Sequence, residues 1–185
     1  VNAGKYATVA TTDWMPYSWS INNVAFAEVM HTSLAYFQAG RREAGFKLLK
    51  SSVLDGMYLG DSPGNFGQIS FYDAARGECY RDFGDPIGVA SRALIQGLYG
   101  ILPDALNGRL LIKPGFPEEW EYASLHTPDI NFDFKAGEAA TGKYSSRDCS
   151  LYTVTHRLPA VRNLELQFSA RRSAVARLTV NGQNA

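Results

Sequence analysis

Residues 85 to 113 read Asp85-Pro-Ile-Gly-Val-Ala-Ser-Arg-Ala-Leu-Ile-Gln-Gly-Leu-Tyr-Gly-Ile-Leu-Pro-Asp-Ala-Leu-Asn-Gly-Arg-Leu-Leu-Ile-Lys113. This stretch changes its hydrophobic period part-way along. Asp85 and Pro86 are residue types favoured at a helix start, and apolar residues follow at helical spacing as far as residue 100. After Pro103 the helical spacing ends, and residues 109–113 read as a short strand. The stretch therefore predicts that a helical half of the chain is followed by a β half.

The residues before this stretch predict a helical hairpin. Apolar residues dominate residues 20–39, which we expect to form a helix that is buried on most of its sides. Residues 41–58 carry an apolar stripe at helical spacing and form the second predicted helix. Gly40 lies between the two, and glycine is favoured just after a helix. We expect two antiparallel helices joined by a short turn, and then a long loop over residues 60–84.

The residues after the stretch predict an antiparallel β-sandwich. Four segments read as strands, and they cover residues 109–113, 129–135, 151–156 and 163–169. No helix is expected beyond residue 130. The predicted fold class is therefore α+β, with a helical domain over residues 1–107 and a β domain over residues 108–185.

The end of the chain predicts half of a hairpin. Asn181-Gly182 is a two-residue turn favoured in hairpins, and it follows the alternating residues 177–180. The chain ends three residues later, at Ala185. We therefore expect no return strand, and a β domain that is truncated.

The composition is that of an ordinary globular protein. Apolar residues make up 45% and charged residues 19% of the 185 residues, and 18 basic residues balance 18 acidic ones. This balance argues against a nucleic-acid or membrane-surface partner that is recognised through bulk charge. No apolar stretch is long enough to span a bilayer.

The sequence carries no clear pattern for a metal or a cofactor, and we expect neither. The three histidines have no metal-ligand spacing with one another or with a cysteine. Residues 137–144 nearly match a phosphate-binding loop, but Tyr144 stands where that motif needs Ser or Thr. Cys79 and Cys149 are expected to be free thiols rather than a disulfide pair.

Aromatic and planar polar residues gather in two places. The first reads Asp13-Trp-Met-Pro-Tyr-Ser-Trp-Ser20, and the second spans residues 61–85. Aromatic faces pack on the C–H groups of sugar rings, and planar polar side chains bond sugar hydroxyls. This composition favours a carbohydrate ligand.

Several segments resemble a known enzyme family. Residues 18–40 and 81–101 are similar to late helices of the six-hairpin (α/α toroid) glycosidases of bacterial polysaccharide breakdown. Leu110-Leu-Ile-Lys-Pro-Gly-Phe-Pro-Glu-Glu-Trp120 resembles their passage from the toroid into a C-terminal β-sandwich. Pro63-Gly-Asn-Phe66 and Arg81-Asp-Phe-Gly-Asp-Pro86 resemble segments of an uncharacterised Bacteroides-type family, and rhamnosidase-like enzymes share its toroid.

The resemblance covers roughly residues 14–135 and implies the C-terminal part of a glycoside hydrolase, in which two carboxylates act as acid and base. A polysaccharide lyase, a phosphorylase on the same toroid and a non-catalytic carbohydrate-binding module stay open as alternatives. A closed (α/α)6 toroid has many more helices than the sequence predicts here. The resemblance therefore implies further helices upstream or on another chain, and we expect this chain alone to be inactive. It also implies an exported protein, in the periplasm or on the cell surface.

Glu28 and Asp82 are the candidate catalytic carboxylates. Glu28 lies among apolar neighbours about two turns, or ~12 Å, from the start of the first predicted helix, and burial there would suit a general acid. A structural carboxylate bonded to a neighbouring helix is the other interpretation. His31 lies one turn beyond, and we expect a hydrogen bond between the two side chains. Asp82 lies in the aromatic segment, whereas Asp85 is expected to cap a helix.

Six further residues are candidates for binding substrate, namely Trp14, Trp19, Asn22, Asn65, Tyr72 and Arg81. The tryptophans either stack on sugar or fill the core. Arg81 either pairs with a neighbouring carboxylate or binds a uronate. In a lyase, Tyr72 or Tyr80 would be the base beside Arg81.

These candidates are expected to meet at one concave end of the helical layer. The first two helices are antiparallel, so the segment before Glu28 and the loop from Asp61 to Asp85 lie at the same end. The third helix begins at Asp85 and therefore starts at this end as well. Helix N-termini would add positive potential there.

Overall fold

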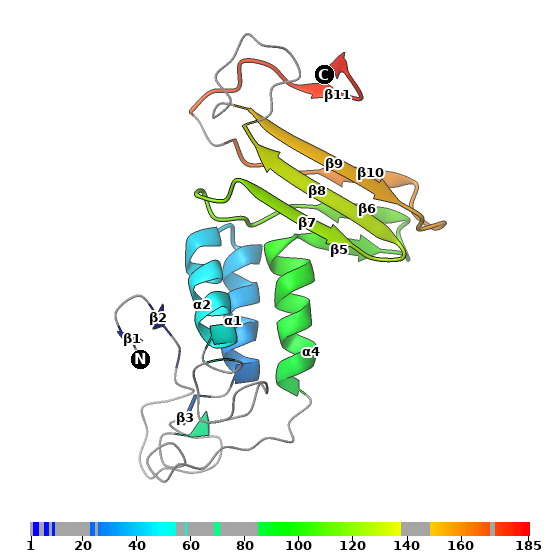
Figure 1. The fold of residues 1–185 in the computed structure, drawn as a ribbon. Coiled ribbons are helices and arrows are strands. Elements are labelled where there is room, and N and C mark those ends of the chain that lie inside the picture. The colour runs from blue at the N-terminus through cyan, green and yellow to red at the C-terminus, as the bar shows by residue number, and fades with distance from the viewer. Residues whose placement is uncertain are drawn as a thin grey trace. The chain divides into compact units, whose positions relative to one another are not determined.

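The computed structural model describes residues 2–3, 6–7, 9, 23–24, 26–54, 58, 69–70, 85–137, 149–170 and 173–185 (Figure 1). Within these residues the chain forms three main helices followed by antiparallel strands, so the predicted α+β class is confirmed. The chain divides into a helical unit, residues 1–102 with 112–117, and a β unit, residues 103–111 with 118–185.

The predicted helical hairpin is present. Helix α1 spans Phe26–Gln38, and helix α2 spans Arg42–Leu54. Gly40 follows α1 with a φ of 74°. Its N–H donates to the carbonyl of Phe37 at 2.9 Å, and the next N–H donates to that of Tyr36 at 2.8 Å. These bonds form the left-handed C-terminal cap that glycine allows, so the prediction for Gly40 is confirmed.

Helix α1 begins later than the sequence predicts. The expected helix started at residue 20, whereas Asn23–Val24 form strand β3 and α1 starts at Phe26. Strand β3 pairs antiparallel with β4, Ile69–Ser70. Asn and Val have low helix propensity. Pairing with a segment far along the chain therefore outweighs their weak preference for a helix.

Helix α1 buries one stripe, so the expectation of burial on most sides was wrong. The buried residues recur at helical spacing and are Phe26, Val29, Met30, Ser33, Leu34 and Phe37. The exposed residues lie on the opposite stripe and are Glu28, His31, Ala35 and Gln38. Alanine counts as apolar in a sequence pattern, but its small surface costs little free energy when it stays in water.

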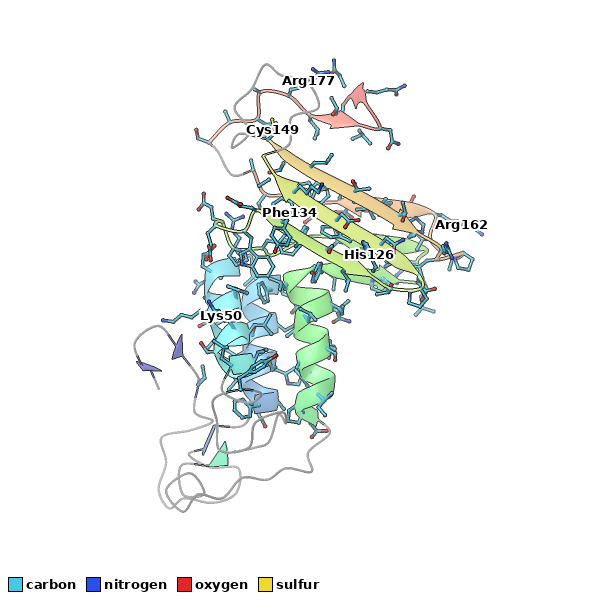
Figure 2. The ribbon with its side chains drawn as sticks, in the orientation of Figure 1. Lys50, His126, Phe134, Cys149, Arg162 and Arg177 are labelled. Carbon is cyan, nitrogen blue, oxygen red and sulfur yellow. The ribbon has the colours of Figure 1, made fainter. Side chains whose placement is uncertain are left out.

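Helix α2 is tied to α1 through a buried hydroxyl. The Oγ of Ser33 donates to the backbone carbonyl of Gly45 at 2.7 Å, and both residues are buried. Glu43, Lys47 and Lys50 of α2 are exposed, as the charge pattern predicts, and Lys50 points away from the helices (Figure 2).

The third helix starts where the sequence predicts, but its turns are not all α-helical. Helix α4 spans Asp85–Arg92, and it continues as a π-helical segment, η2, over Ala93–Leu98. The Tyr99 N–H donates to the carbonyl five residues earlier, that of Leu94, at 3.0 Å. The start at Asp85-Pro86 is therefore confirmed, and the helix ends at Leu98, two residues before the predicted end at residue 100. The last turns are wider than those of an α-helix.

The ring of Phe37 is a closely packed contact of the helical unit. Phe37 is 5% exposed, and three glycines face its ring. A Cβ atom on Gly97 of η2 would lie 2.6 Å from Cδ2, and one on Gly115 would lie 2.5 Å from Cδ1. A Cβ atom on Gly45 of α2 would lie 3.0 Å from Cγ. Three segments therefore reach Phe37 closely because each lacks a side chain at the contact.

The chain leaves the helices through a second close approach, at Gly100. Its φ is 64°, and a side chain there would overlap the backbone carbonyl of Lys113. The carbonyl of Gly100 accepts from the Lys113 N–H, and that of Leu98 accepts from the Gly115 N–H, each at 2.9 Å. These two bonds hold the segment that carries Gly115 beside the end of η2.

Six strands form two three-stranded sheets. They are β5 (Ile101–Asp104), β6 (Arg109–Ile112), β7 (Tyr122–His126), β8 (Ile130–Ala136), β9 (Ser150–His156) and β10 (Asn163–Leu166). The orders are β10-β6-β5 and β7-β8-β9. The sequence predicts β6, β8, β9 and β10 but misses β5 and β7, and β7 contains no β-branched residue. In the described part of the chain no helix follows residue 130, as predicted.

The sheet β7-β8-β9 has one apolar face. Ile130, Phe132 and Phe134 alternate along β8 and are at most 7% exposed. The ring of Tyr152 in β9 stacks on Phe134, with centroids 5.0 Å apart, and on Phe168, with centroids 3.9 Å apart. The period-two pattern that predicts β8 therefore reflects burial of this face.

The C-terminal hairpin is more complete than expected. Strand β11, Thr179–Val180, pairs antiparallel with β12, Gln183–Asn184, around Asn181 and Gly182. Both turn residues have positive φ, 51° and 78°, as a two-residue hairpin turn requires. The turn is confirmed, and the expectation that no return strand forms was wrong, because two residues suffice for the pairing.

Gly97→Ala is expected to destabilise the chain by about 1–3 kcal/mol, because the new methyl overlaps the Phe37 ring. Gly88→Ala is the matched control in the same helix, since a Cβ there meets nothing within 4 Å. We expect Gly88→Ala to stabilise by about 0.5–1 kcal/mol. Urea unfolding of the three proteins measures both effects. Equal effects of the two substitutions would contradict the central role of the Phe37 contact.

The turn between β5 and β6 contains a carboxylate with a shifted pKa. The Asn107 side chain donates to Asp104 Oδ2 at 2.8 Å, and the Asn107 N–H donates to Oδ1 at 3.2 Å. These two bonds, with a smaller contribution from the charge of Arg109, lower the pKa of Asp104 below its ordinary value of 3.8. The stabilisation is present above the ordinary pKa and is lost as the pH falls through the lowered one.

Asp104→Asn is therefore expected to lower the thermal unfolding temperature at pH 6. The difference from wild type is expected to shrink as the pH falls below 3.8. Thermal unfolding at a series of pH values measures it, with Asp129→Asn, an exposed aspartate between β7 and β8, as the control. A difference that stays constant from pH 6 to pH 2 would rule out the linkage to Asp104.

Candidate functional site

The candidate site lies at one end of the helical unit. Helix α1 and helix α4 begin at this end, and α2 ends there, because α1 and α2 are antiparallel (Figure 1). The turn at Gly40 lies at the opposite end of α1. The predicted arrangement of the three helices is therefore present.

Strands β3 and β4 bring together the two segments that were expected to converge. Asn23 is the partner of Ser70, and Val24 is the partner of Ile69. Strand β3 lies just before α1, and β4 lies within the loop predicted for residues 60–84. Backbone pairing thus joins the entrance of α1 to this segment, and the expected convergence is confirmed at this point.

Glu28 lies at the rim of this end and not below it. Because α1 starts at Phe26, Glu28 is in its first turn, about 3 Å from the helix start at 1.5 Å per residue. Its side chain is exposed. The expectation of a buried carboxylate about two turns into the helix was therefore wrong. The error follows from the late start of α1 and from its exposed stripe.

His31 is also exposed and does not bond Glu28. Within the described residues, the expected hydrogen bond between these two side chains is absent. The hydrogen bond near Glu28 runs instead from Thr32 Oγ1 to the Glu28 carbonyl, at 2.8 Å. Side chains three residues apart can reach one another on a helix, but exposed ones gain little by ordering themselves to do so.

Glu28 and Asp85 have a shared electrostatic role. Each is an acidic residue in the first turn of its helix, α1 or α4. A negative charge in that position interacts favourably with the unpaired N–H groups and the helix dipole. This is a structural role for Glu28 that is compatible with a role in chemistry.

The other candidates lie outside the described residues. They are Trp14, Trp19, Asn22, Asn65, Tyr72, Tyr80, Arg81 and Asp82, and the cavity expected to be shared among them lies there too. Cys149 is a free, half-buried thiol, as predicted. Cys79 lies outside the described residues.

The structure describes one group of polar residues that the sequence analysis misses. His126 Nε2 lies 3.1 Å and 3.2 Å from the two carboxylate oxygens of Asp133, across strands β7 and β8. The carboxylate only accepts, so Nε2 carries the hydrogen. Polar residues alternate over residues 122–126, and this period-two pattern would have predicted β7 and its outward side chains.

The described residues lack two features that would indicate a function. No cluster of three or more His, Cys, Asp or Glu side chains there could hold a metal ion. No helix in that part of the chain has the length and apolar content to cross a membrane.

Comparisons with known proteins find no protein that is similar to this chain. The chain matches no family model, no curated protein and no solved structure. The function is therefore argued from the residues and their arrangement.

A disulfide tests the convergence at β3 and β4. In a background with Cys79 and Cys149 changed to Ser, Val24→Cys with Ile69→Cys is expected to oxidise readily. Directly opposed residues have Cα atoms about 4.5–5.5 Å apart, within the range of a disulfide. In the control pair, Val24→Cys with Gln38→Cys, Val24 lies just before the start of α1 and Gln38 lies at its end, so this pair is expected to stay reduced. Thiol titration and non-reducing electrophoresis measure both, and equal oxidation of the two pairs would contradict the register.

Proposed function

We propose that this chain is the C-terminal part of a carbohydrate-active enzyme, a glycoside hydrolase that acts on a poly- or oligosaccharide. In this proposal α1, α2 and α4 belong to an (α/α)6 toroid, and the strands after residue 102 belong to an antiparallel β-sandwich. The remaining helices of the toroid would come from upstream sequence or from another chain.

The pairing of β3 with β4 is the observation that supports the proposal best. It joins the start of α1 to the segment that carries most of the aromatic and planar polar residues. The helices α1 and α4 start at the same end, so both N-termini face the same region (Figure 1). Loops at one end of a rigid helical layer are a common place for substrate-binding residues.

The proposed chemistry uses Glu28 and Asp82. A general acid has to hold a proton at neutral pH, which generally needs a desolvated site, whereas a general base acts in its ionised form. The exposed side chain of Glu28 fits the base, which activates water, and Asp82 is then assigned the acid. Trp14 and Trp19 would stack on sugar rings, and Asn22, Asn65, Tyr72 and Arg81 would bond hydroxyl groups.

A lyase or a phosphorylase on the same helices, or a carbohydrate-binding module without catalysis, are the alternatives. Each leaves a different product. A hydrolase makes a new reducing end, a lyase makes an unsaturated sugar, a phosphorylase makes a sugar phosphate, and a binding module makes no product. Product analysis of the full-length protein on a panel of polysaccharides therefore separates them.

Carboxylate-to-amide substitutions in the full-length protein test the assigned residues. Glu28→Gln and Asp82→Asn are each expected to lower kcat by about 100-fold or more, because each removes an acid or a base. Glu43→Gln is the matched control, since Glu43 is an exposed glutamate in the first turn of α2, at the other end of the hairpin. It is expected to keep the wild-type kcat.

Thermal unfolding shows whether each variant is folded. Folded Glu28→Gln and Asp82→Asn proteins with wild-type kcat and KM would show that neither carboxylate acts in catalysis. An equal loss in Glu43→Gln would show that the effect is not local to this end of the helices.

A further inference from the structure

The third helix carries an exposed apolar stripe that runs from α4 into the first residues of η2. This α4 stripe consists of Ile87, Ser91 and Leu94, which recur at helical spacing and are all exposed. Ile87 is 55% exposed and Leu94 is 39% exposed, so two large aliphatic side chains on one face lie in water. The buried Pro86 and Ala93 lie on another face, and α4 and η2 pack beside α1 (Figure 1). The α4 stripe is therefore available to another molecule.

The middle of the α4 stripe has small side chains. Ser91 lies four residues after Ile87 and three residues before Leu94, and the half-buried Ala90 lies next to it in the sequence. The Oγ of Ser91 donates to the carbonyl of Ile87 at 2.9 Å. Small side chains allow a second helix to approach closely, and this hydroxyl brings no unpaired donor into such a contact.

Two opposite charges lie along one side of the α4 stripe. Asp85 is in the first turn of α4, and Arg92 is in its last turn, seven residues later and on the same side of the helix. The guanidinium of Arg92 donates to Oε1 of Gln96 at 3.2 Å and 3.3 Å, which directs it toward the end of η2. Among the described residues neither Asp85 nor Arg92 forms an ion pair within the chain.

The apolar and the charged residues share one centre. Ile87 and Leu94 lie equally far from the midpoint between residues 90 and 91, and Asp85 and Gln96 do as well. A second copy of the helix that lies antiparallel about a two-fold axis at this midpoint therefore brings Ile87 of each copy onto Leu94 of the other.

The same arrangement pairs the charges. Asp85 of each copy meets Gln96 of the other copy, and Arg92 is bonded to that Gln96, so opposite charges meet at both ends. A parallel second copy would instead bring Asp85 onto Asp85 and Arg92 onto Arg92. This complementarity of the helix to its own antiparallel copy favours a second copy of the chain as the occupant of the α4 stripe.

We propose that two copies of this chain associate through the α4 stripe, with their α4 helices antiparallel. Two turns of one helix bury less than the about 800 Å² per partner of a standard interface, so the dimer is weak and depends on the protein concentration. The proposal uses only α4 and η2 and does not rest on the proposed function.

Sedimentation equilibrium from about 10 µM to about 1 mM protein measures the association. The average mass of the wild-type chain is expected to rise toward that of two copies. Ile87→Gln and Leu94→Gln are each expected to raise the dissociation constant about tenfold or more, because each removes an apolar contact twice per dimer. Leu106→Gln is the control, because Leu106 is 99% exposed between β5 and β6 and lies outside the α4 stripe.

Thermal unfolding at low concentration is expected to show wild-type stability for these three variants, because the replaced side chains are exposed. A wild-type chain that stays monomeric at about 1 mM would overturn the proposal. Equal association by wild type and both variants of the α4 stripe would also overturn it.

An exchange of charges tests the antiparallel arrangement. Asp85→Lys and Arg92→Glu each bring like charges together at both ends and are each expected to weaken self-association. In an equimolar mixture of the two variants, opposite charges meet again at both ends of the mixed dimer, which is expected to form more readily than either variant dimer. A mixture of folded variants that associates no better than its components would overturn the arrangement.

A cross-link tests the same arrangement without a change at Asp85, which also begins α4. In the background with Cys79 and Cys149 changed to Ser, an oxidised mixture of Ile87→Cys and Leu94→Cys proteins is expected to form a disulfide between copies. Ile87→Cys alone is expected to form far less, because the two positions lie about 10 Å apart along the axes at 1.5 Å per residue.

Peptide mapping by mass spectrometry identifies the linked positions. The control mixture is Ile87→Cys with Lys50→Cys, because Lys50 is an exposed residue of α2. Preferential linkage of Ile87→Cys to itself, or equal linkage in the control mixture, would overturn the proposal.

The full-length protein distinguishes a second copy from another helix of the same protein. A cross-link that forms in this chain but not in the full-length protein would assign the α4 stripe to such a helix and overturn the proposal, whereas formation in both supports it. Glu28→Gln and Asp82→Asn are expected to leave the association unchanged, so loss of activity and loss of association are measured separately.

Discussion

The helical unit depends on the close packing of the Phe37 ring against three glycines. The ring comes from α1, and the glycines come from α2, from η2 and from the segment after β6. Four segments of the chain therefore meet at one side chain. Because interiors are packed at near-crystalline density, a methyl group at any of the three glycines has no free space to occupy. The wide turns of η2 and the backbone hydrogen bond at Gly100 then hold Gly115 beside the ring. Burial of this one ring thus couples the helical hairpin to the point where the chain turns into strands.

Local signals in the sequence were sufficient for most of the elements. The Asp85-Pro86 start, the stop at Gly40 and the alternation over residues 129–135 each act within a few residues, and each is found in the structure. The errors at residues 23 and 24 arise because pairing with a segment distant in the sequence determines their structure. Residues 23 and 24 could extend a helix, but they pair with residues 69 and 70, and no pattern within residues 20–39 carries that information. Strand β7 was missed for another reason, since its Tyr-Ala-Ser-Leu-His sequence alternates in polarity but contains no β-branched residue.

The misjudged burial of Glu28 has a different cause. A count of apolar residues treats Ala27 and Ala35 as equal to Phe26 and Met30, although alanine gains far less from burial. The structure exposes the stripe with Glu28, His31, Ala35 and Gln38, and it buries the stripe with the large side chains. The position of Glu28 along the helix also depended on where α1 starts, so one missed strand pair moved it from the interior to the rim. Sequence could identify a carboxylate near the predicted site, but its depth and exposure follow from tertiary pairing.

The rim position of Glu28 changes which chemistry it can support. A carboxylate in a dry pocket is suited to donate a proton, while one in water at a helix N-terminus is held as an anion by the dipole and by solvation. Glu28 lies in the first turn of α1, and its side chain is exposed. If α1 is one wall of a larger concave site, then a proton donor has to come from a residue that another segment shields from water. Strand β4 pairs with β3 at the start of α1, and Asp82 follows β4 in the sequence. The proposed division of roles, with Glu28 as the base and Asp82 as the acid, rests on the exposed position of Glu28 and on the pairing of β3 with β4.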